Sequence, residues 1–156
     1  MSKKFIGKVA VVTGASRGIG KSIALSLASQ GARVVCTATI AENADTTVAD
    51  IEATGGQAMS IGCRVEDPDM VKDSFALIHQ NYGSVDILVN NAGISKPMLT
   101  MEMSEENWDI HMDINCKSIF LCSQVVAHQM KENGGGCIIN IGSILGQNAF
   151  SATLGY

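Results

Sequence analysis

The sequence predicts an α/β domain in which helices cover both faces of a doubly wound parallel sheet, a three-layer Rossmann-type fold. Short apolar runs alternate with longer segments of helical periodicity along the chain. The runs are continuously apolar, which is typical of strands buried on both faces. A glycine-rich loop follows the first run and opens the first helix. Because no linker or low-complexity segment interrupts the 156 residues, we expect one domain, residues 1–156.

The first half of the chain predicts a complete β-α-β-α-β unit with right-handed crossovers. Its elements, in order, are a strand at 9–12, a helix at 18–30, a strand at 33–38, a helix at 42–54 and a strand at 57–63. Apolar residues of the first helix recur at spacings of three and four between Ile19 and Ala28. Gly31 ends that helix, and Gly55 and Gly56 close the second one.

The second half repeats the alternation and stops after its second strand. Its elements, in order, are a helix at 68–82, a strand at 85–90, a long helical stretch from about 104 to 131 and a strand at 137–142. Pro68 lies in a first turn, where its missing N–H costs nothing, and Ser104 caps the long stretch. The final strand would form an exposed apolar edge, which favours aggregation. We therefore expect a sheet that lacks its last strands and a chain that continues downstream.

Composition excludes several classes of function. The formal net charge of −4 argues against nucleic-acid binding, which needs a basic face. The chain shows no signal peptide and no run near the roughly 20 apolar residues of a membrane span, so we expect a cytoplasmic protein. Five cysteines form no CxxC pair and sit among apolar neighbours, which predicts buried thiols in a reducing compartment. The three histidines lack metal-ligand spacing, so no metal site is expected.

The glycine loop predicts a site for a dinucleotide. It follows a strand and opens a helix, which is the context that gives such a loop meaning. Gly14 permits the tight turn, Gly18 lets the backbone approach a pyrophosphate, and Gly20 allows close packing of helix on sheet. The helix N-terminus then offers N–H groups and a positive dipole to the phosphates.

Several motifs in order resemble those of the short-chain dehydrogenases/reductases. They are the loop Thr13-Gly14-x3-Gly18-Ile19-Gly20, then Asn90-Asn91-Ala92-Gly93, Asn115, Ser143 and Tyr156. The resemblance covers the whole chain, and within the family 11–20 and 37–39 are most similar to 3-oxoacyl-acyl-carrier-protein reductases of fatty acid biosynthesis. It implies an NAD(P)-dependent oxidoreductase that reduces a carbonyl to an alcohol and assembles as a homo-oligomer, a dimer or tetramer.

The resemblance also implies which residues hold the cofactor. They are Gly14, Ala15, Ser16, Arg17, Gly18, Ile19, Gly20, Thr39, Arg64, Val65, Asn91, Ala92 and Gly93. NADP(H) is favoured over NAD(H), because the stretch 37–39 carries no carboxylate to repel a 2′-phosphate and Arg17 offers a fixed positive charge. Arg64 departs from the acid that the family often has beside the adenine ring, so that side-chain hydrogen bond is lost and stacking on the ring becomes an alternative.

The resemblance assigns three catalytic residues. Ser143 hydrogen-bonds the carbonyl oxygen of the substrate, Tyr156 donates the proton, and Asn115 joins a proton relay through water. A free phenol has a pKa near 10, which the family lowers with a lysine four residues after the tyrosine. That position lies beyond residue 156, so we expect the chain as given to be a truncated, inactive or nearly inactive form of its parent reductase.

The substrate is the least constrained part of the prediction. Met98, Met101 and Met103 follow the fourth strand, where pliable side chains suit an acyl chain or serve ordinary packing. The turn 131–136 carries little net charge where carrier-protein reductases tend to be basic, which weakens that assignment. A small ketone, sugar or alcohol is the enzymatic alternative. A nucleotide-binding protein without catalysis is the alternative from another class.

Overall fold

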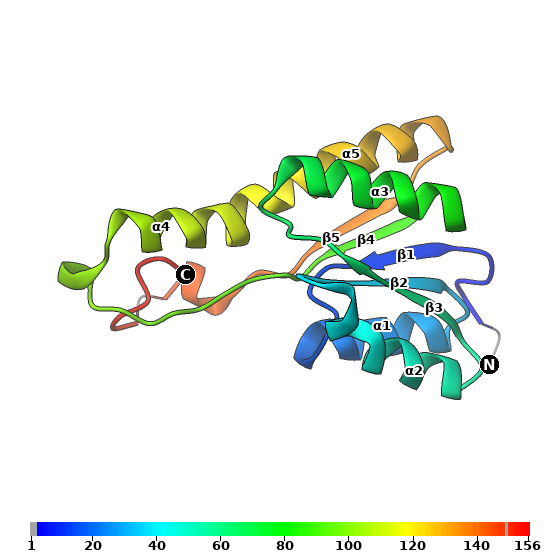
Figure 1. Ribbon diagram of the computed structural model, residues 1–156, viewed down its shortest axis with the longest axis horizontal. Coiled ribbons are helices and arrows are strands. Elements are labelled where there is room, and N and C mark those ends of the chain that lie inside the picture. Colours follow the sequence, from blue (N-terminus) through cyan, green and yellow to red (C-terminus); the bar gives the residue numbers. More distant parts are fainter. Residues whose placement is uncertain (1–2, 149) are drawn as a thin grey trace.

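The computed structural model describes residues 3–148 and 150–156 and shows five parallel strands in one sheet, in the order β3-β2-β1-β4-β5 (Figure 1). The strands are β1 (Val9–Val12), β2 (Arg33–Ala38), β3 (Gln57–Gly62), β4 (Ile87–Asn90) and β5 (Cys137–Asn140). The α-helices are α1 (Gly18–Ser29), α2 (Asp45–Ala53), α3 (Pro68–Tyr82), α4 (Glu105–Met112) and α5 (Ser118–Glu132). The predicted doubly wound, Rossmann-type α/β fold is confirmed.

Helices cover both faces of the sheet, with α1 and α2 on one side and α3 and α5 on the other (Figure 1). Alternate residues of β1 show why its apolar run is continuous: Val9 and Val11 belong to the core under α3 and α5, whereas Ala10 and Val12 belong to the core over α1 and α2. All four are at most 1% exposed. Burial of apolar side chains therefore stabilises both faces of this sheet, whereas a sheet covered by helices on one side is stabilised on that face alone.

The strand order reverses at β1, which pairs with β2 on one side and with β4 on the other. The chain after β1 continues into α1 on one face of the sheet, and the chain after β4 leads to α5 on the other face (Figure 1). Both connections begin side by side at the carboxyl edge of the sheet. In doubly wound sheets this edge is where ligands bind. The fold therefore brings the glycine loop and the segment after Asn90 together, although they lie far apart in sequence.

Most predicted boundaries hold to within two residues. The predicted strands at 57–63, 85–90 and 137–142 are shorter, at Gln57–Gly62, Ile87–Asn90 and Cys137–Asn140. Each ends where its register with the neighbouring strand ends, at the pairs Ala38↔Gly62 and Asn90↔Asn140. The predicted helix at 42–54 divides into a 3₁₀ turn, Ala41–Ala44, and α2.

The predicted continuous helix from 104 to 131 is interrupted. A π-helical segment, Asp113–Lys117, separates α4 from α5. Such single π turns insert one extra residue into the helical ladder and change which side chains face the neighbouring element. Ser104 caps α4 as expected, because its hydroxyl accepts a hydrogen bond from the Asn107 amide at 3.2 Å.

The cysteine prediction is wrong at two positions. Cys36, Cys63 and Cys122 are buried, and burial raises the pKa of Cys36 and of Cys122 to about 12. Cys116 and Cys137 are exposed. Cys116 lies in the π-helical segment, and Cys137 begins β5 at the edge of the sheet, where neither face is covered. Apolar neighbours in sequence do not bury a thiol when its element lies at a boundary of the fold.

The strand β5 has the exposed character that its predicted position at the edge of the sheet implies. All four of its residues are exposed, and Ile138 and Ile139 keep 36% and 43% of their surface. In the residues that the structure describes, none of the helices is long and apolar enough to cross a membrane.

Candidate functional site

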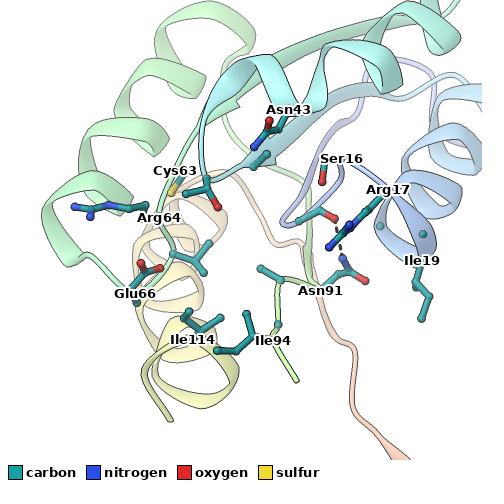
Figure 2. Close-up of a pocket in the computed structure, with 18 residues that line it drawn as sticks. Ser16, Arg17, Ile19, Asn43, Cys63, Arg64, Glu66, Asn91, Ile94 and Ile114 are labelled. Atoms are coloured by element: carbon teal, nitrogen blue, oxygen red, sulfur yellow. Dashed lines mark hydrogen bonds between the residues drawn. The ribbon is translucent and has the colours of Figure 1, made fainter. Parts of the chain in front are cut away.

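A pocket of about 850 Å³ opens at the carboxyl edge of the sheet, between the glycine loop and the residues that follow β3 and β4 (Figure 2). Its volume lies within the range typical of small-molecule sites. It is lined by all of the residues predicted to hold a cofactor except Ala15. Sequence reasoning missed six further lining residues, which are Ala38, Asn43, Cys63, Glu66, Ile94 and Ile114.

The N-terminus of α1 opens directly into this pocket. Gly14 and Gly18 take the left-handed backbone conformation, with φ of +64° and +57°, which bends the loop around the start of the helix. Arg17 is the N-cap residue, but its side chain makes no capping hydrogen bond, and the first turn of α1 carries no acidic residue. The N–H groups of this turn therefore remain available to an anion in the pocket.

Asn91 locks the glycine loop from the other side. Its side-chain amide donates a hydrogen bond to the carbonyl oxygen of Thr13 at 2.8 Å. It donates a second one to the carbonyl oxygen of Gly14 at 3.2 Å (Figure 2). Gly20 is packed under this contact, and a Cβ at that position would collide with the Gly14 carbonyl oxygen and lie 2.5 Å from Asn91 Nδ2. The absence of a side chain at Gly20 is thus what allows helix, loop and Asn91 to meet.

Thr13 joins the two motifs at the switch point. It is 2% exposed, and its hydroxyl oxygen accepts hydrogen bonds from the backbone amides of Asn91, at 2.9 Å, and Ala92, at 3.0 Å. The same hydroxyl donates to the carbonyl oxygen of Val89 at 3.3 Å. One side chain therefore satisfies three backbone groups just where β4 ends, and it sets the position of the segment 91–93 relative to the loop.

Ala15, which is predicted to hold the cofactor, does not line the pocket. It is fully buried; its amide donates to the Thr37 carbonyl at 2.9 Å, and its carbonyl accepts from the Thr47 hydroxyl at 2.8 Å. The turn directs Ala15 downward onto β2 and α2 while its neighbours Ser16 and Arg17 face the pocket. Its place in the site is that of an anchor for the loop.

The pocket is lined by a basic side chain at the glycine loop, by neutral side chains after β2 and by an acidic side chain after β3. Arg17 is exposed and, within the described residues, forms no ion pair. Thr39 and Asn43 line the wall that follows β2 and carry no charge. Glu66 is the one carboxylate among the lining residues, and it lies on the side of Arg64 and Ile114 (Figure 2).

Arg64 is held at the start of α3. Its guanidinium pairs with Asp67 at 2.9 Å, and its Nε lies 3.3 Å from the sulfur of Met70. Asp67 is the N-cap of α3 and accepts the amides of Met70 and Asp69. These two N–H groups, with Arg64, hold the pKa of Asp67 below its usual value. The pair orients Arg64 before any ligand enters, and whether the arginine stacks on an adenine stays a prediction.

Asn115 lies in the π-helical segment and supports the floor of the pocket. Its side-chain oxygen accepts the Ile94 amide at 2.8 Å, and its side-chain nitrogen donates to the Ile94 carbonyl at 2.9 Å. Ile94 and Ile114 lie close together at this floor (Figure 2). The Asn115 amide is therefore engaged with backbone, in an arrangement that the sequence did not indicate.

Ser143 and Tyr156 lie outside the pocket lining. Ser143 stands three residues after β5, and its hydroxyl accepts the Leu145 amide at 3.1 Å, at the start of the 3₁₀ turn Ile144–Gly146. Tyr156 is 43% exposed, and its amide donates to the Thr153 carbonyl at 3.1 Å. No hydrogen bond within the described part of the chain joins Asn115, Ser143 and Tyr156, so the structure assembles the predicted cofactor residues but not the predicted catalytic ones.

The missed lining residues left different signals in the sequence. Asn43 lies in the turn after β2, the region where a ribose-binding acid is looked for, and a wider search there would have included it. Cys63 and Glu66 flank two residues that were predicted. Ile94 and Ile114 look like ordinary apolar residues in the sequence. In the fold, Asn115, which follows Ile114, bonds the backbone of Ile94.

Comparison with known proteins gives consistent results. A family model described as short chain dehydrogenase matches residues 8–156. The 3-oxoacyl-[acyl-carrier-protein] reductase of Staphylococcus epidermidis (strain ATCC 35984) is 45% identical over 142 residues, 90% of this chain and 58% of that protein. Its counterpart from Escherichia coli (strain K12) is 42% identical, over 91% of this chain and 57% of that protein.

A solved structure extends the likeness to three dimensions. A metagenomic short-chain oxidoreductase, crystallised in complex with NADP, superposes with a TM-score of 0.93 at 38% identity, covering 97% of this chain and 69% of that one. The chain thus spans less than three fifths of the length of the two curated relatives described above.

Proposed function

Because the chain belongs to the short-chain dehydrogenase family, we propose that it carries the nucleotide site and the reacting groups of an NADPH-dependent oxidoreductase. The reaction is reduction of a carbonyl to an alcohol. The substrate class that the relatives favour is a 3-oxoacyl thioester on an acyl carrier protein, as in fatty acid biosynthesis. Residues 1–156 form one nucleotide-binding domain in this proposal.

One observation carries the proposal: the uncapped N-terminus of α1, with Arg17 beside it, opens into a pocket large enough for a nucleotide. Gly18 has open space where a Cβ would stand, so its backbone can approach a ligand closely. The donor set of free N–H groups and a guanidinium suits phosphate oxygens. The residues present therefore fit a dinucleotide, whose reduced nicotinamide supplies the hydride when it is bound.

The preference for NADPH over NADH rests on the wall after β2. An enzyme that selects NADH usually places an acid there to hold the ribose hydroxyls. Here Ala38, Thr39 and Asn43 occupy this wall, and none can repel a 2′-phosphate. The NADP bound to the metagenomic relative supports the same choice.

Three residues supply the remaining chemistry in this proposal. Ser143 donates a hydrogen bond to the substrate carbonyl, and Tyr156 transfers the proton to the developing alkoxide. Asn115 acts through the segment that begins at Ile94, because its amide is bonded to that backbone on both sides. Ser143 lies at the carboxyl edge of the sheet, where the pocket also opens.

The charge of the turn 131–136 does not argue against a carrier protein. This turn precedes β5 and therefore lies at the amino edge of the sheet, at the opposite end from the pocket (Figure 1). The carboxyl edge instead carries exposed Arg17, Arg64 and Lys96. Basic side chains at the pocket edge suit an acidic carrier protein, although Arg64 is already paired with Asp67.

We also propose a homo-oligomer in which α4 and α5 form the contact. Trp108, Ile110 and Phe120 lie on these two helices and keep 38%, 37% and 58% of their surface. Exposed large apolar side chains are enriched at subunit interfaces.

Replacement of Arg17 by alanine tests the cofactor assignment. We expect KM for NADPH to rise about 10- to 100-fold, the effect of losing a hydrogen bond to a charged group, with little change for NADH. Initial rates with both cofactors measure this. Lys21→Ala is the matched control, since Lys21 lies on the same helix and its ammonium pairs with Asp50 at 2.7 Å. An equal loss with both cofactors would assign Arg17 to the shared pyrophosphate instead.

The substrate class is tested by NADPH oxidation in protein expressed from its complete natural coding sequence. We expect kcat/KM to be highest for a 3-oxoacyl thioester on acyl carrier protein, lower for the same acyl group on a pantetheine analogue, and lowest for small ketones or sugars. The reverse order would favour a small ketone, sugar or alcohol as substrate. Saturable NADPH binding without turnover of any carbonyl would favour the alternative that the protein binds a nucleotide but catalyses no reaction.

A further inference from the structure

His111 is the one histidine that the fold buries completely within the described residues, and the proposed reaction does not yet use it. It is 1% exposed in the last turn of α4. Its Nε2 accepts a hydrogen bond from the backbone amide of Lys96 at 3.1 Å, and its Nδ1 donates to the Asn107 carbonyl at 2.6 Å. An amide can only donate, so the ring proton lies on Nδ1 and the lone pair on Nε2.

The ring also touches the residue before Tyr156. Gly155 is buried against it: a Cβ on Gly155 would lie 3.1 Å from Cγ and 3.3 Å from Nδ1 of His111. Real Cβ atoms rarely lie this close to another group, so the backbone of Gly155 is packed directly against the imidazole. His111 therefore contacts both the segment after β4 and the turn that carries Tyr156.

These two segments are further joined to each other. The amide of Met98 donates to the Ala152 carbonyl at 2.8 Å, and Met98 pairs with Thr153 as an isolated parallel bridge. Ala152 has a φ of +62°, which is costly for a residue with a side chain and persists only where the surroundings impose it. The strain is consistent with a turn that packing and hydrogen bonds hold in one position.

The segment 94–98 is held at alternate residues by three different partners. Asn115 binds the backbone of Ile94, His111 binds that of Lys96, and Ala152 binds that of Met98. Ile94 lines the pocket, whereas Met98 contacts the turn before Tyr156. His111 thus occupies the middle of a continuous connection between the cofactor pocket and the tyrosine.

From this geometry we infer that His111 is a positioning residue, which sets the place of Tyr156 and of segment 94–98 relative to the pocket. It does not touch the reacting atoms. The inference rests on the proposed function in so far as Tyr156 is the proton donor there. An apolar side chain of similar size would fill the same space but leave the Lys96 amide without its acceptor, and this separates positioning from mere packing.

The test compares two His111 variants in protein made from the complete natural coding sequence. In His111→Leu we expect kcat to fall about 10- to 100-fold, because a displacement of about 1 Å at a reacting group has an effect of this size, with KM for NADPH unchanged. In His111→Gln the side-chain oxygen can accept the Lys96 amide, and we expect most of kcat to return. Equal rates in His111→Leu and the natural protein, or no rescue by glutamine, would overturn the inference.

A second measurement does not depend on activity. In the natural protein we expect slow hydrogen exchange at the Lys96 amide and a ¹⁵N spectrum of the His111 ring with its proton on Nδ1. In His111→Leu the amide should exchange faster, and in His111→Gln it should stay protected. Fast exchange in the natural protein would overturn the inference. If no carbonyl is reduced at all, the proposed function fails, while these spectra still show whether His111 holds the segment.

Gly155→Ala perturbs the same contact and keeps the imidazole with both of its hydrogen-bonding nitrogens. The added methyl group must displace the ring or the turn, so we expect kcat to fall while both binding of NADPH and folding persist. Gly146→Ala is the matched control, because Gly146 has open space at its Cβ position and no left-handed φ. A kcat for Gly155→Ala equal to that of the control would contradict the positioning role.

Discussion

Replacing Tyr156 by phenylalanine is expected to reduce the rate of carbonyl reduction by about 10²- to 10⁴-fold, the usual contribution of a general acid. The substitution removes only the phenolic hydroxyl, which is the proposed proton donor. Tyr156 does not line the nucleotide pocket, so the dissociation constant for NADPH should not change. Steady-state rates and fluorescence titration with NADPH measure the two effects separately.

Tyr82→Phe is the matched control for this substitution. Tyr82 is the only other tyrosine in the chain, and its ring lies under the guanidinium of Arg33, 5.3 Å from ring centroid to Cζ, at the end of α3. Removal of the Tyr82 hydroxyl should leave the rate of carbonyl reduction unchanged. If Tyr156→Phe retains the rate of the control, another group donates the proton and the catalytic assignment fails.

Replacing Gly20 by alanine is expected to abolish measurable NADPH binding and to lower the free energy of unfolding by about 1–3 kcal/mol, the usual cost of overpacking. The new methyl group would collide with the Gly14 carbonyl oxygen and with Asn91 Nδ2, which together shape the loop. The first collision is with backbone, so rotation of a side chain cannot relieve it. Chemical denaturation and NADPH titration measure the two losses.

Gly146→Ala controls for the general effect of adding a methyl group to a glycine outside the loop. It should bind NADPH normally, and its unfolding free energy should differ little from that of the natural protein. Unchanged NADPH affinity in Gly20→Ala would mean that the loop can move away from α1, and the close packing of helix, loop and Asn91 would then not be required for binding.

Much of the architecture could be predicted because it depends on local pattern. The run at 9–12 is a strand buried on both faces, and Asp67 with Pro68 starts α3 as helix-start chemistry requires. The glycine loop could be assigned to a nucleotide because a strand precedes it and a helix follows it. Twelve of the thirteen predicted cofactor residues line the pocket, Ala15 being the exception, and those outside the glycine loop were predicted from the family resemblance.

Other features could not be read from the sequence. The segment 113–117 contains no proline or glycine, so nothing in the sequence indicates a π-helical turn there. Cys116 and Cys137 have apolar neighbours but are exposed, because burial depends on what another part of the chain places over them. Two of the contacts of His111, with Lys96 and with Gly155, also lie outside its own helix, 15 positions before and 44 positions after it.

By itself, the sequence determined the order of strands and helices, the position of the glycine loop and the residue types available for chemistry. These follow from side-chain periodicity and backbone preference, which act over a few residues. The tertiary structure alone decided that Thr13 joins two distant motifs, that Asn115 grips Ile94, and that His111 lies between the pocket and Tyr156. Such contacts depend on the relative position of whole elements, which the packing of both faces of the sheet sets and no local pattern encodes.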